Sequence, residues 1–244
     1  MKNKIGWCSM TFNPVWGCLN NCEYCYARAI AKRFYNKMYN LEWNYYGKNC
    51  PSWAFKGDYL ERLIHFKPTF LVSQFEKKFP KKPQRIFVGS MSDIYYWKDE
   101  WLEKVLEKVK LYPQHTFQFL TRYPEVYDRY IFPKDCWLGV TVTNNEGYCN
   151  PTFIVNIDKI KNIKYISIEP ILEEINISYI NYLEVDWVII GAETGNRKGK
   201  IIPKKEWIED IVNYCQVGNI PIYLKDSLKD IYPVEIKEFP KEGK

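Results

Sequence analysis

Short runs of β-branched and aromatic residues recur along the chain, with apolar side chains at nearly every position. They lie at 85–89 (RIFVG), 116–120 (TFQFL), 137–142 (WLGVTV), 165–168 (YISI), 187–190 (WVII) and 220–224 (IPIYL). Runs that are apolar on both faces are typical of strands in a buried parallel sheet. A further strand is expected within 5–12.

Amphipathic helical patterns separate some of these runs. Residues 99–111 place five apolar side chains on one face, and 203–215 begin with Pro203 and continue at helical spacing. Strand starts 20 to 35 residues apart indicate repeated βα units. We therefore expect an α/β fold, a partial TIM-like barrel of six to seven parallel strands, in a single domain over 1–244. A doubly wound sheet is the alternative, but no GxGxxG follows the first strand.

Residues 41–80 interrupt this rhythm with many aromatic residues, Gly and Pro. We interpret the stretch as an insertion with one or two helices, next to a cysteine-rich segment. Loops after barrel strands lie on the face where active sites are built. The insertion is thus a candidate lid or substrate-binding segment. Ordinary packing of its aromatic rings, Trp43, Tyr45, Tyr46, Trp53 and Phe55, is the alternative.

The chain has 244 residues, of which 46% are hydrophobic, and its formal net charge is +6. Much of the excess lies in two groups of basic residues, at 77–85 and 197–205. Such groups are compatible with DNA or RNA as a partner, although a solvated surface also accounts for them. No apolar run is long enough to span a bilayer and no secretory signal is evident. We expect a cytoplasmic protein with no membrane partner.

The strongest chemical signal lies at 13–28 (NPVWGCLNNCEYCYAR), where Cys18, Cys22 and Cys25 form C-x3-C-x2-C. These positions would share one helical face, so small apolar side chains on a helix are one explanation. The Pro, Gly and Asn residues around them instead favour a loop, and a helix is predicted only over 27–34. Clustered thiols in an intracellular protein indicate metal binding or catalysis.

The kind of metal stays open at this point. A structural zinc site takes four protein ligands, and Cys8 or Cys50 would have to supply the fourth. A 4Fe–4S cluster normally takes four thiolates, so three thiolates leave one iron open to a ligand. The first arrangement suits a non-catalytic zinc or iron–sulfur nucleic-acid-binding module, and the second suits a reactive cluster.

The C-x3-C-x2-C spacing, with aromatic Tyr24 before the last cysteine, resembles the signature of the radical S-adenosylmethionine (SAM) superfamily. Further segments are similar to a phage-associated family of unknown function within or beside it. They are 12–15 (FNPV), 89–93 (GSMSD), 119–122 (FLTR), 138–142 (LGVTV), 167–170 (SIEP) and 190–195 (IGAETG). The likeness covers nearly the whole chain, and the family's usual GGESG is GAETG here.

This resemblance implies a 4Fe–4S cluster on the three cysteines, with SAM bound to the fourth iron. An external one-electron reductant of flavodoxin or ferredoxin type would drive cleavage of SAM to a 5′-deoxyadenosyl radical. That radical would abstract hydrogen from a substrate, for which the basic groups and the aromatic insertion favour nucleic acid, with a peptide or small molecule as the alternative. Cys149 is a candidate for returning a hydrogen atom, although a lone cysteine is more often core packing.

Polar residues follow the predicted strands, where barrel enzymes place their active sites. They are Ser90, Ser92, Asp93, Arg122, Thr143, Asn144, Glu169, Glu193 and Lys225. Capping of the following helices is the alternative for each. By the resemblance, Ser90, Ser92 or Asp93 would bind the SAM ammonium, Thr143 and Asn144 its ribose, and the backbone at Tyr24 its adenine. The remaining four are left for substrate or the SAM carboxylate, and we expect acid–base pairs among them.

Overall fold

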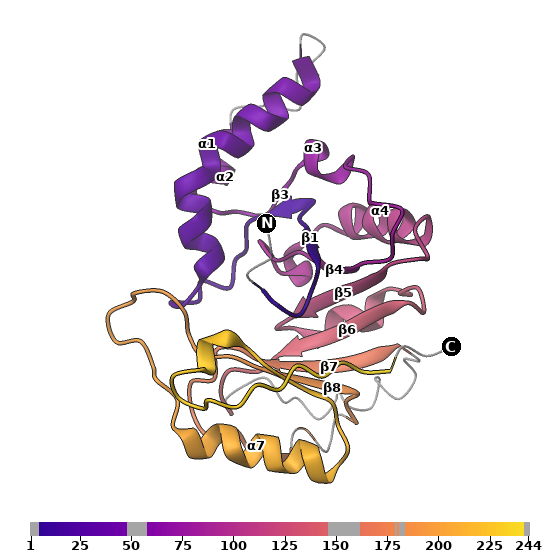
Figure 1. Cartoon of the computed structure of the whole chain (residues 1–244). Helices are drawn as coiled ribbons and strands as arrows, with labels where there is room; N and C mark the ends of the chain where they lie inside the picture. Colours follow the sequence, from indigo (N-terminus) through magenta and orange to yellow (C-terminus); the bar gives the residue numbers. More distant parts are fainter. Residues whose placement is uncertain (1–4, 48–57, 146–161, 179, 181–183, 242–244) are drawn as a thin grey trace. The chain divides into compact units, whose positions relative to one another are not determined.

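The structure is a computed structural model that describes residues 5–47, 58–145, 162–178, 180 and 184–241 (Figure 1). Seven strands form one sheet of order β1-β4-β5-β6-β7-β8-β9. Their bounds are β1 Met10–Phe12, β4 Arg85–Val88, β5 Thr116–Thr121, β6 Cys136–Thr141, β7 Ile163–Ile168, β8 Trp187–Ile190 and β9 Ile222–Leu224. The pairs β1–β4, β6–β7, β7–β8 and β8–β9 are parallel. The predicted α/β class is therefore confirmed.

The chain divides into two compact units, Met10–Phe117 and Met1–Ser9 with Gln118–Lys244. The first unit holds the β1–β4 pair and the antiparallel pair of β2 (Val15–Trp16) and β3 (Thr69–Phe70). Its helices are α1 Tyr26–Tyr46, α2 Tyr59–Ile64, α3 Val72–Phe75, the 3-10 helix η2 Ile94–Tyr96 and α4 Asp99–Lys110. The five apolar residues predicted on one face of α4 are all buried.

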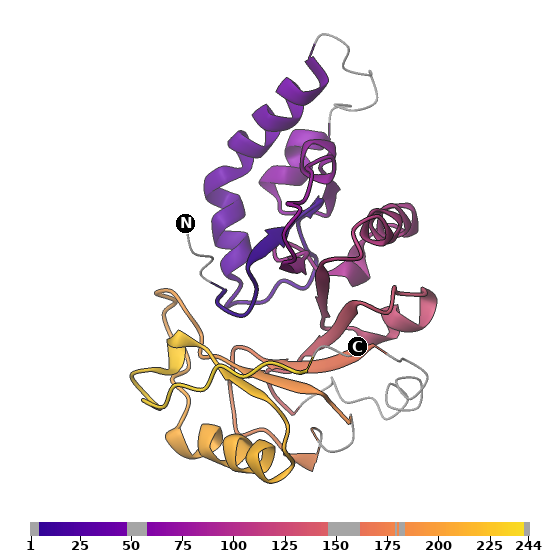
Figure 2. The ribbon, with the colours of Figure 1, turned by 45° about the vertical axis from the view of Figure 1, so that its right-hand side comes forward.

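Helix α1 is much longer than the helix predicted over 27–34, because it continues to Tyr46 and ends at Gly47. The expected insertion therefore begins inside α1 and includes α2 and α3, in line with the helices expected there. On α1, Glu42 is 1% exposed and accepts N–H groups from Val72 and Ser73, at the start of α3. Figure 2 shows α1 as the long helix of this unit, extending past its strands.

Two aromatic residues of the expected insertion, for which core packing was the alternative explanation, are exposed. Trp43 is 51% exposed and Tyr45 49% exposed, so burial in the core does not account for these rings. Trp53 and Phe55 lie outside the described residues. A core cluster does form nearby, from Trp16, Ala27, Ala31, Leu63, Phe66, Leu71 and Met91.

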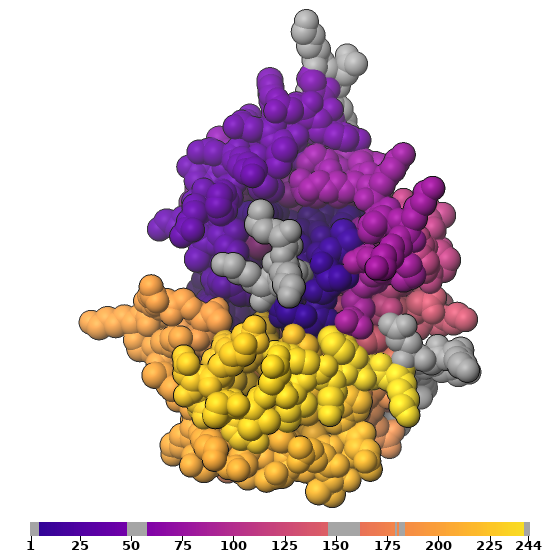
Figure 3. All heavy atoms as spheres, viewed as in Figure 1, coloured from indigo at the N-terminus to yellow at the C-terminus, as the bar shows by residue number. Residues whose placement is uncertain are grey.

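The second unit contains β6 to β9, the 3-10 helices η3 Pro124–Arg129 and η4 Asp226–Leu228, and α7 Lys205–Val217. Figure 3 shows the C-terminal segment (yellow) and α7 (orange) at its surface. Within it, Trp187 contacts the rings of Trp137, Tyr165, Tyr223 and Phe239. Trp7 adds a further ring against Tyr165 and Trp187.

The first strand was expected within residues 5–12, and β1 occupies only the end of that segment. Trp7 is 1% exposed and packs in this aromatic cluster, so only Met10–Phe12 of the expected 5–12 remains in the sheet. In the part of the chain that the structure describes, no helix is long and apolar enough to cross a membrane.

Candidate functional site

The cysteine loop joins β2 to α1 and is fixed at its start by backbone contacts. The N–H of Gly17 donates to Met91 O at 3.0 Å, and that of Cys18 donates to Phe66 O at 2.9 Å. Gly17 has φ +109°, and a Cβ there would lie 2.3 Å from Lys67 O. Only glycine allows this close approach of two backbone segments. The expectation of a loop rather than a helix through the cysteines is confirmed.

Two of the three thiols accept backbone N–H groups. Cys18 Sγ accepts from Asn20 at 3.4 Å, and Cys25 Sγ accepts from Arg28 at 3.3 Å as the N-cap of α1. Burial raises the pKa of Cys18 to about 12 and also raises the pKa of Cys25. The charge of Cys22 acts in the same direction on both pKa values. As thiolates the three side chains would repel one another, and a bound cation would relieve that repulsion.

The three sulfurs do not converge on one point. Across the described ranges, no group of three or more His, Cys, Asp or Glu side chains is arranged to hold a single metal ion. Thiolates on one tetrahedral zinc would lie about 3.8 Å apart, given bonds of about 2.3 Å. In a 4Fe–4S cluster each thiolate binds a different iron, so the sulfurs need not converge. Three thiols on a constrained loop, two of them receiving N–H groups, are a donor set that fits such a cluster.

A hydrogen-bonded network ties this loop to the segment after β4. Asn20 Nδ2 donates to Asp93 Oδ2 at 3.0 Å, and the Tyr96 hydroxyl donates to Asn20 Oδ1 at 3.0 Å. Asp93 is 5% exposed and also caps η2 by accepting the N–H of Tyr95. Sequence reasoning singled out Asp93 but missed Asn20 and Tyr96 as its companions.

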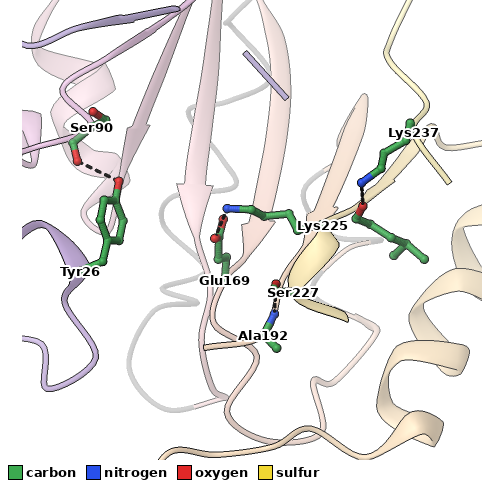
Figure 4. A network of polar contacts seen from close by, with 8 residues as sticks. Tyr26, Ser90, Glu169, Ala192, Lys225, Ser227 and Lys237 are labelled. Carbon is green, nitrogen blue, oxygen red and sulfur yellow. Dashed lines mark hydrogen bonds and ion pairs between the residues drawn. The ribbon is translucent and has the colours of Figure 1, made fainter. Parts of the chain in front are cut away.

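The other predicted residues of this unit also have structural partners. Ser90 Oγ donates to Asn13 Oδ1, and Ser92 Oγ accepts the indole N–H of Trp97, both at 3.0 Å. The Tyr26 hydroxyl donates to the backbone oxygen of Ser90 at 2.9 Å (Figure 4). Tyr24 lies half-buried between Cys22 and Cys25. These contacts support the capping alternative for Asp93 and leave the proposed SAM contacts as predictions.

In the other unit, Glu169 and Lys225 form an ion pair, with side chains 23% and 14% exposed (Figure 4). Glu169 follows Ile168 of β7 and Lys225 follows Leu224 of β9, and both of these strand residues are in register with Ile190 of β8. Gly191, the residue after Ile190, therefore lies between the two side chains of the pair. A Cβ at Gly191 would lie 3.0 Å from Lys225 Cδ and 3.1 Å from Glu169 Cγ. The absence of a side chain at Gly191 thus gives the pair its room. The expected acid–base pairing is confirmed for these two residues.

Glu193 pairs outside the predicted set of four. Its carboxylate accepts two hydrogen bonds from Arg197, at 2.7 and 2.8 Å, and is 3% exposed. These hydrogen bonds hold the pKa of Glu193 below its ordinary value. The expectation of a partner in Arg122 or Lys225 is wrong for Glu193, because the turn after β8 brings Arg197 back onto it. Glu193 anchors that turn.

Arg122 and the predicted ribose contacts lie together in this unit. Arg122 Nη2 donates to Thr143 Oγ1 at 3.4 Å. Asn144 Oδ1 is buried and accepts no hydrogen bond from the residues described. Ser167 Oγ is likewise buried without a hydrogen-bond partner there, and Ser167 precedes Glu169 by two positions, so both face the same side. Buried polar atoms of this kind are candidates for contacting a ligand. Cys149 lies outside the described residues.

Fold and site together define an α/β protein with a thiol loop before its first long helix and a carboxylate–ammonium pair at the ends of its last strands. The chain belongs to a family described as "Protein of unknown function (DUF5131)", which matches residues 2–231. No curated protein and no solved structure matches it.

Proposed function

We propose that this protein is an enzyme of the radical SAM type, in which Cys18, Cys22 and Cys25 hold a 4Fe–4S cluster. The observation that carries the proposal is the thiol loop. Two of its three thiols receive backbone N–H groups, and Gly17 locks its start against the segment at Phe66 and Lys67. A bound cluster would supply the electron that cleaves SAM. Membership of the family neither supports nor contradicts the proposed activity, because the family has no stated activity.

The chain's own residues would position the cluster and its ligand. The Asn20–Asp93–Tyr96 network holds the loop against η2, which limits how far Cys18 and Cys22 move when a metal binds. Cys25, at the first turn of α1, is held by the helix itself. Rigid support of this kind places reactive groups reproducibly.

The Glu169–Lys225 pair supplies charged groups for a ligand. Lys225 can donate to a carboxylate, and Glu169 can accept from an ammonium or hydroxyl group. Asn144 Oδ1 and Ser167 Oγ would gain the hydrogen bonds that they lack among the described residues. The pair itself suits a polar ligand group such as a carboxylate, an ammonium or a hydroxyl of the substrate. The proposal includes a partial TIM-like barrel, which the chain-order succession of the strands favours.

The test is SAM cleavage by the full chain, reconstituted anaerobically with iron and sulfide. We expect visible iron–sulfur absorbance, and 5′-deoxyadenosine from SAM when dithionite is added. Replacing Cys18, Cys22 or Cys25 by Ala should abolish both, because three ligands are the minimum for this kind of site. Cys215→Ala is the matched control, since Cys215 is a fully buried thiol of α7. Its loss should cost only packing, about 1 kcal/mol, and leave the product unchanged.

Two results would contradict the proposal. The first is 5′-deoxyadenosine formation by the three-cysteine variant at the wild-type rate. The second is wild-type protein that binds zinc, takes up no cluster and cleaves no SAM, which would assign the loop to a zinc-binding module instead.

A further inference from the structure

Among the residues that the structure describes, the exposed aromatic side chains are concentrated on one helix. Tyr26, Phe34, Trp43 and Tyr45 are each at least 41% exposed, and all four belong to α1. Every other Phe, Tyr and Trp in the described ranges is buried or only partly exposed. Large rings usually lie in the core, so their restriction to one helix marks a surface.

Most of these rings lie along one side of α1. Six exposed residues of α1 follow one another at intervals of 4, 4, 3, 4 and 4 residues. With 3.6 residues per turn, this spacing keeps all six on one side of the helix. The six are Tyr26, Ile30, Phe34, Lys37, Leu41 and Tyr45. We call them the α1 stripe, and it is about 28 Å long at about 1.5 Å per residue. Trp43 lies about 200° around the helix from Leu41, on the opposite side.

The exposed charge of α1 is entirely positive. Lys37 and Arg33 are exposed on or beside the row of rings, whereas exposed Lys32 and partly exposed Arg28 lie on the opposite side of the helix. The helix has one acidic residue, Glu42, and its carboxylate is buried against the backbone of Val72 and Ser73. A partner for this surface should therefore be negatively charged.

We propose that the α1 stripe binds single-stranded nucleic acid. Unpaired bases stack on exposed aromatic rings, and phosphates pair with neighbouring lysine and arginine side chains. The stripe offers rings and aliphatic side chains in a row, with Lys37 among them and Arg33 beside them. A second copy of this chain is a poor occupant, since its α1 carries no exposed acidic side chain to pair with Lys37 and Arg33.

The start of the stripe lies beside the proposed metal ligands. Tyr26 directly follows Cys25, and its hydroxyl group is held by the backbone oxygen of Ser90 (Figure 4). A strand stacked along α1 would thus reach the cysteine loop. The inference deepens the proposed function by naming its substrate class, and it rests on that function only for what happens to the bound strand.

The experiment measures binding alone, without SAM cleavage. Fluorescein-labelled oligo(dT) and oligo(rU) of about 15 nucleotides, within the range of known single-strand sites, are titrated with the reconstituted full chain. The readout is fluorescence anisotropy, and comparing the two probes separates DNA from RNA. With about two phosphates contacted, by Lys37 and Arg33, binding should weaken about sevenfold between 50 and 200 mM salt.

Two stripe variants are each compared with a matched control. Phe34→Ala should weaken binding at least about fivefold, whereas Trp43→Ala, on the opposite side of the same helix, should change it less than about twofold. Lys37→Glu should weaken binding and reduce the salt slope by about 0.7. Lys104→Glu makes the same charge change at an exposed position of α4 and should leave the slope unchanged.

Several results would overturn the inference. They are no binding at low salt, equal losses in stripe and control variants, a preference for duplex over single strands, or loss of binding on Lys198→Glu but not on Lys37→Glu. Binding to phosphatidylglycerol vesicles instead of oligonucleotides would assign the stripe to a lipid surface. Binding that depends on the stripe, in protein that cleaves no SAM, would support this inference and count only against the proposed function.

Discussion

Adding one methyl group at Gly17 should disable the cysteine loop. Gly17 lies at φ +109°, and a Cβ would meet Lys67 O at 2.3 Å, Lys67 C at 2.4 Å and Phe66 O at 2.8 Å. All three contacts are with backbone atoms, so no side chain can rotate away. To reach an ordinary separation of about 3.4 Å from Lys67 O, the two segments must part by about 1 Å.

The magnitude follows from two contributions. The left-handed backbone conformation costs an alanine about 1–2 kcal/mol. Parting the segments weakens the hydrogen bonds from Gly17 N–H to Met91 O and from Cys18 N–H to Phe66 O, worth about 0.5–1.5 kcal/mol each. Gly17→Ala should thus lower the free energy of unfolding by about 2–5 kcal/mol. Gly47 is the matched control, because it has φ +56° and no atom lies within 4 Å of the position that a Cβ would take there. Gly47→Ala should therefore cost only the strain of its backbone conformation (φ +56°, ψ −144°), about 1–3 kcal/mol.

The assays are urea unfolding and iron content after anaerobic reconstitution. Gly17→Ala should bind little iron, because Cys18 is the next residue and moves with the displaced backbone, whereas Gly47→Ala should bind as much as wild type. The reasoning is refuted if Gly17→Ala takes up iron normally and is no less stable than Gly47→Ala.

Two further predictions concern the other unit. Hydrogen bonds from Arg197 hold the pKa of Glu193 below its ordinary value. The ionised carboxylate therefore stabilises the fold at any pH above the ordinary pKa of a glutamate, and this stabilisation is lost as the pH falls through the lower pKa of the folded state. Arg197→Gln should therefore move acid unfolding to higher pH, as followed by tryptophan fluorescence, and an unchanged midpoint would argue against it. Lys225→Met should slow 5′-deoxyadenosine formation at least about tenfold, the loss expected for a charged hydrogen bond, without changing iron content. Lys229→Met, at an exposed lysine, should leave the rate unchanged, and equal rates for both variants would exclude a role for the ion pair.

The sheet was predictable because its strands are buried on both faces. The run Trp187–Ile190 is apolar at every position, and the structure buries all four residues in a strand with these bounds. The length of α1 was not predictable from the same pattern. Beyond Phe34 its outer side carries exposed apolar side chains such as Leu41 and Tyr45, which obscures the amphipathic signal that marks a helix.

In the candidate site, the features that depend on neighbouring residues were predictable, and the contacts between residues far apart in the sequence were not. The cysteine loop was predictable, because turn-forming residues and thiol spacing lie together in the sequence. The Asn20–Asp93 hydrogen bond joins residues 73 positions apart, and no local pattern indicates it. Glu193 and Arg197 are four residues apart, but their pairing depends on a turn in which Gly195 adopts φ +90°. The sequence shows that such a glycine is present but not the direction in which it turns the chain.

The sulfur of Cys25 serves two structural purposes at once. It is a proposed metal ligand, and it also accepts the N–H of Arg28 as the N-cap of α1. Oxidation or alkylation of that one atom would therefore remove a proposed metal ligand and also break the N-cap hydrogen bond of α1. Chemical damage at the proposed metal ligand would therefore also disturb Tyr26, the first residue of the helix and of the α1 stripe.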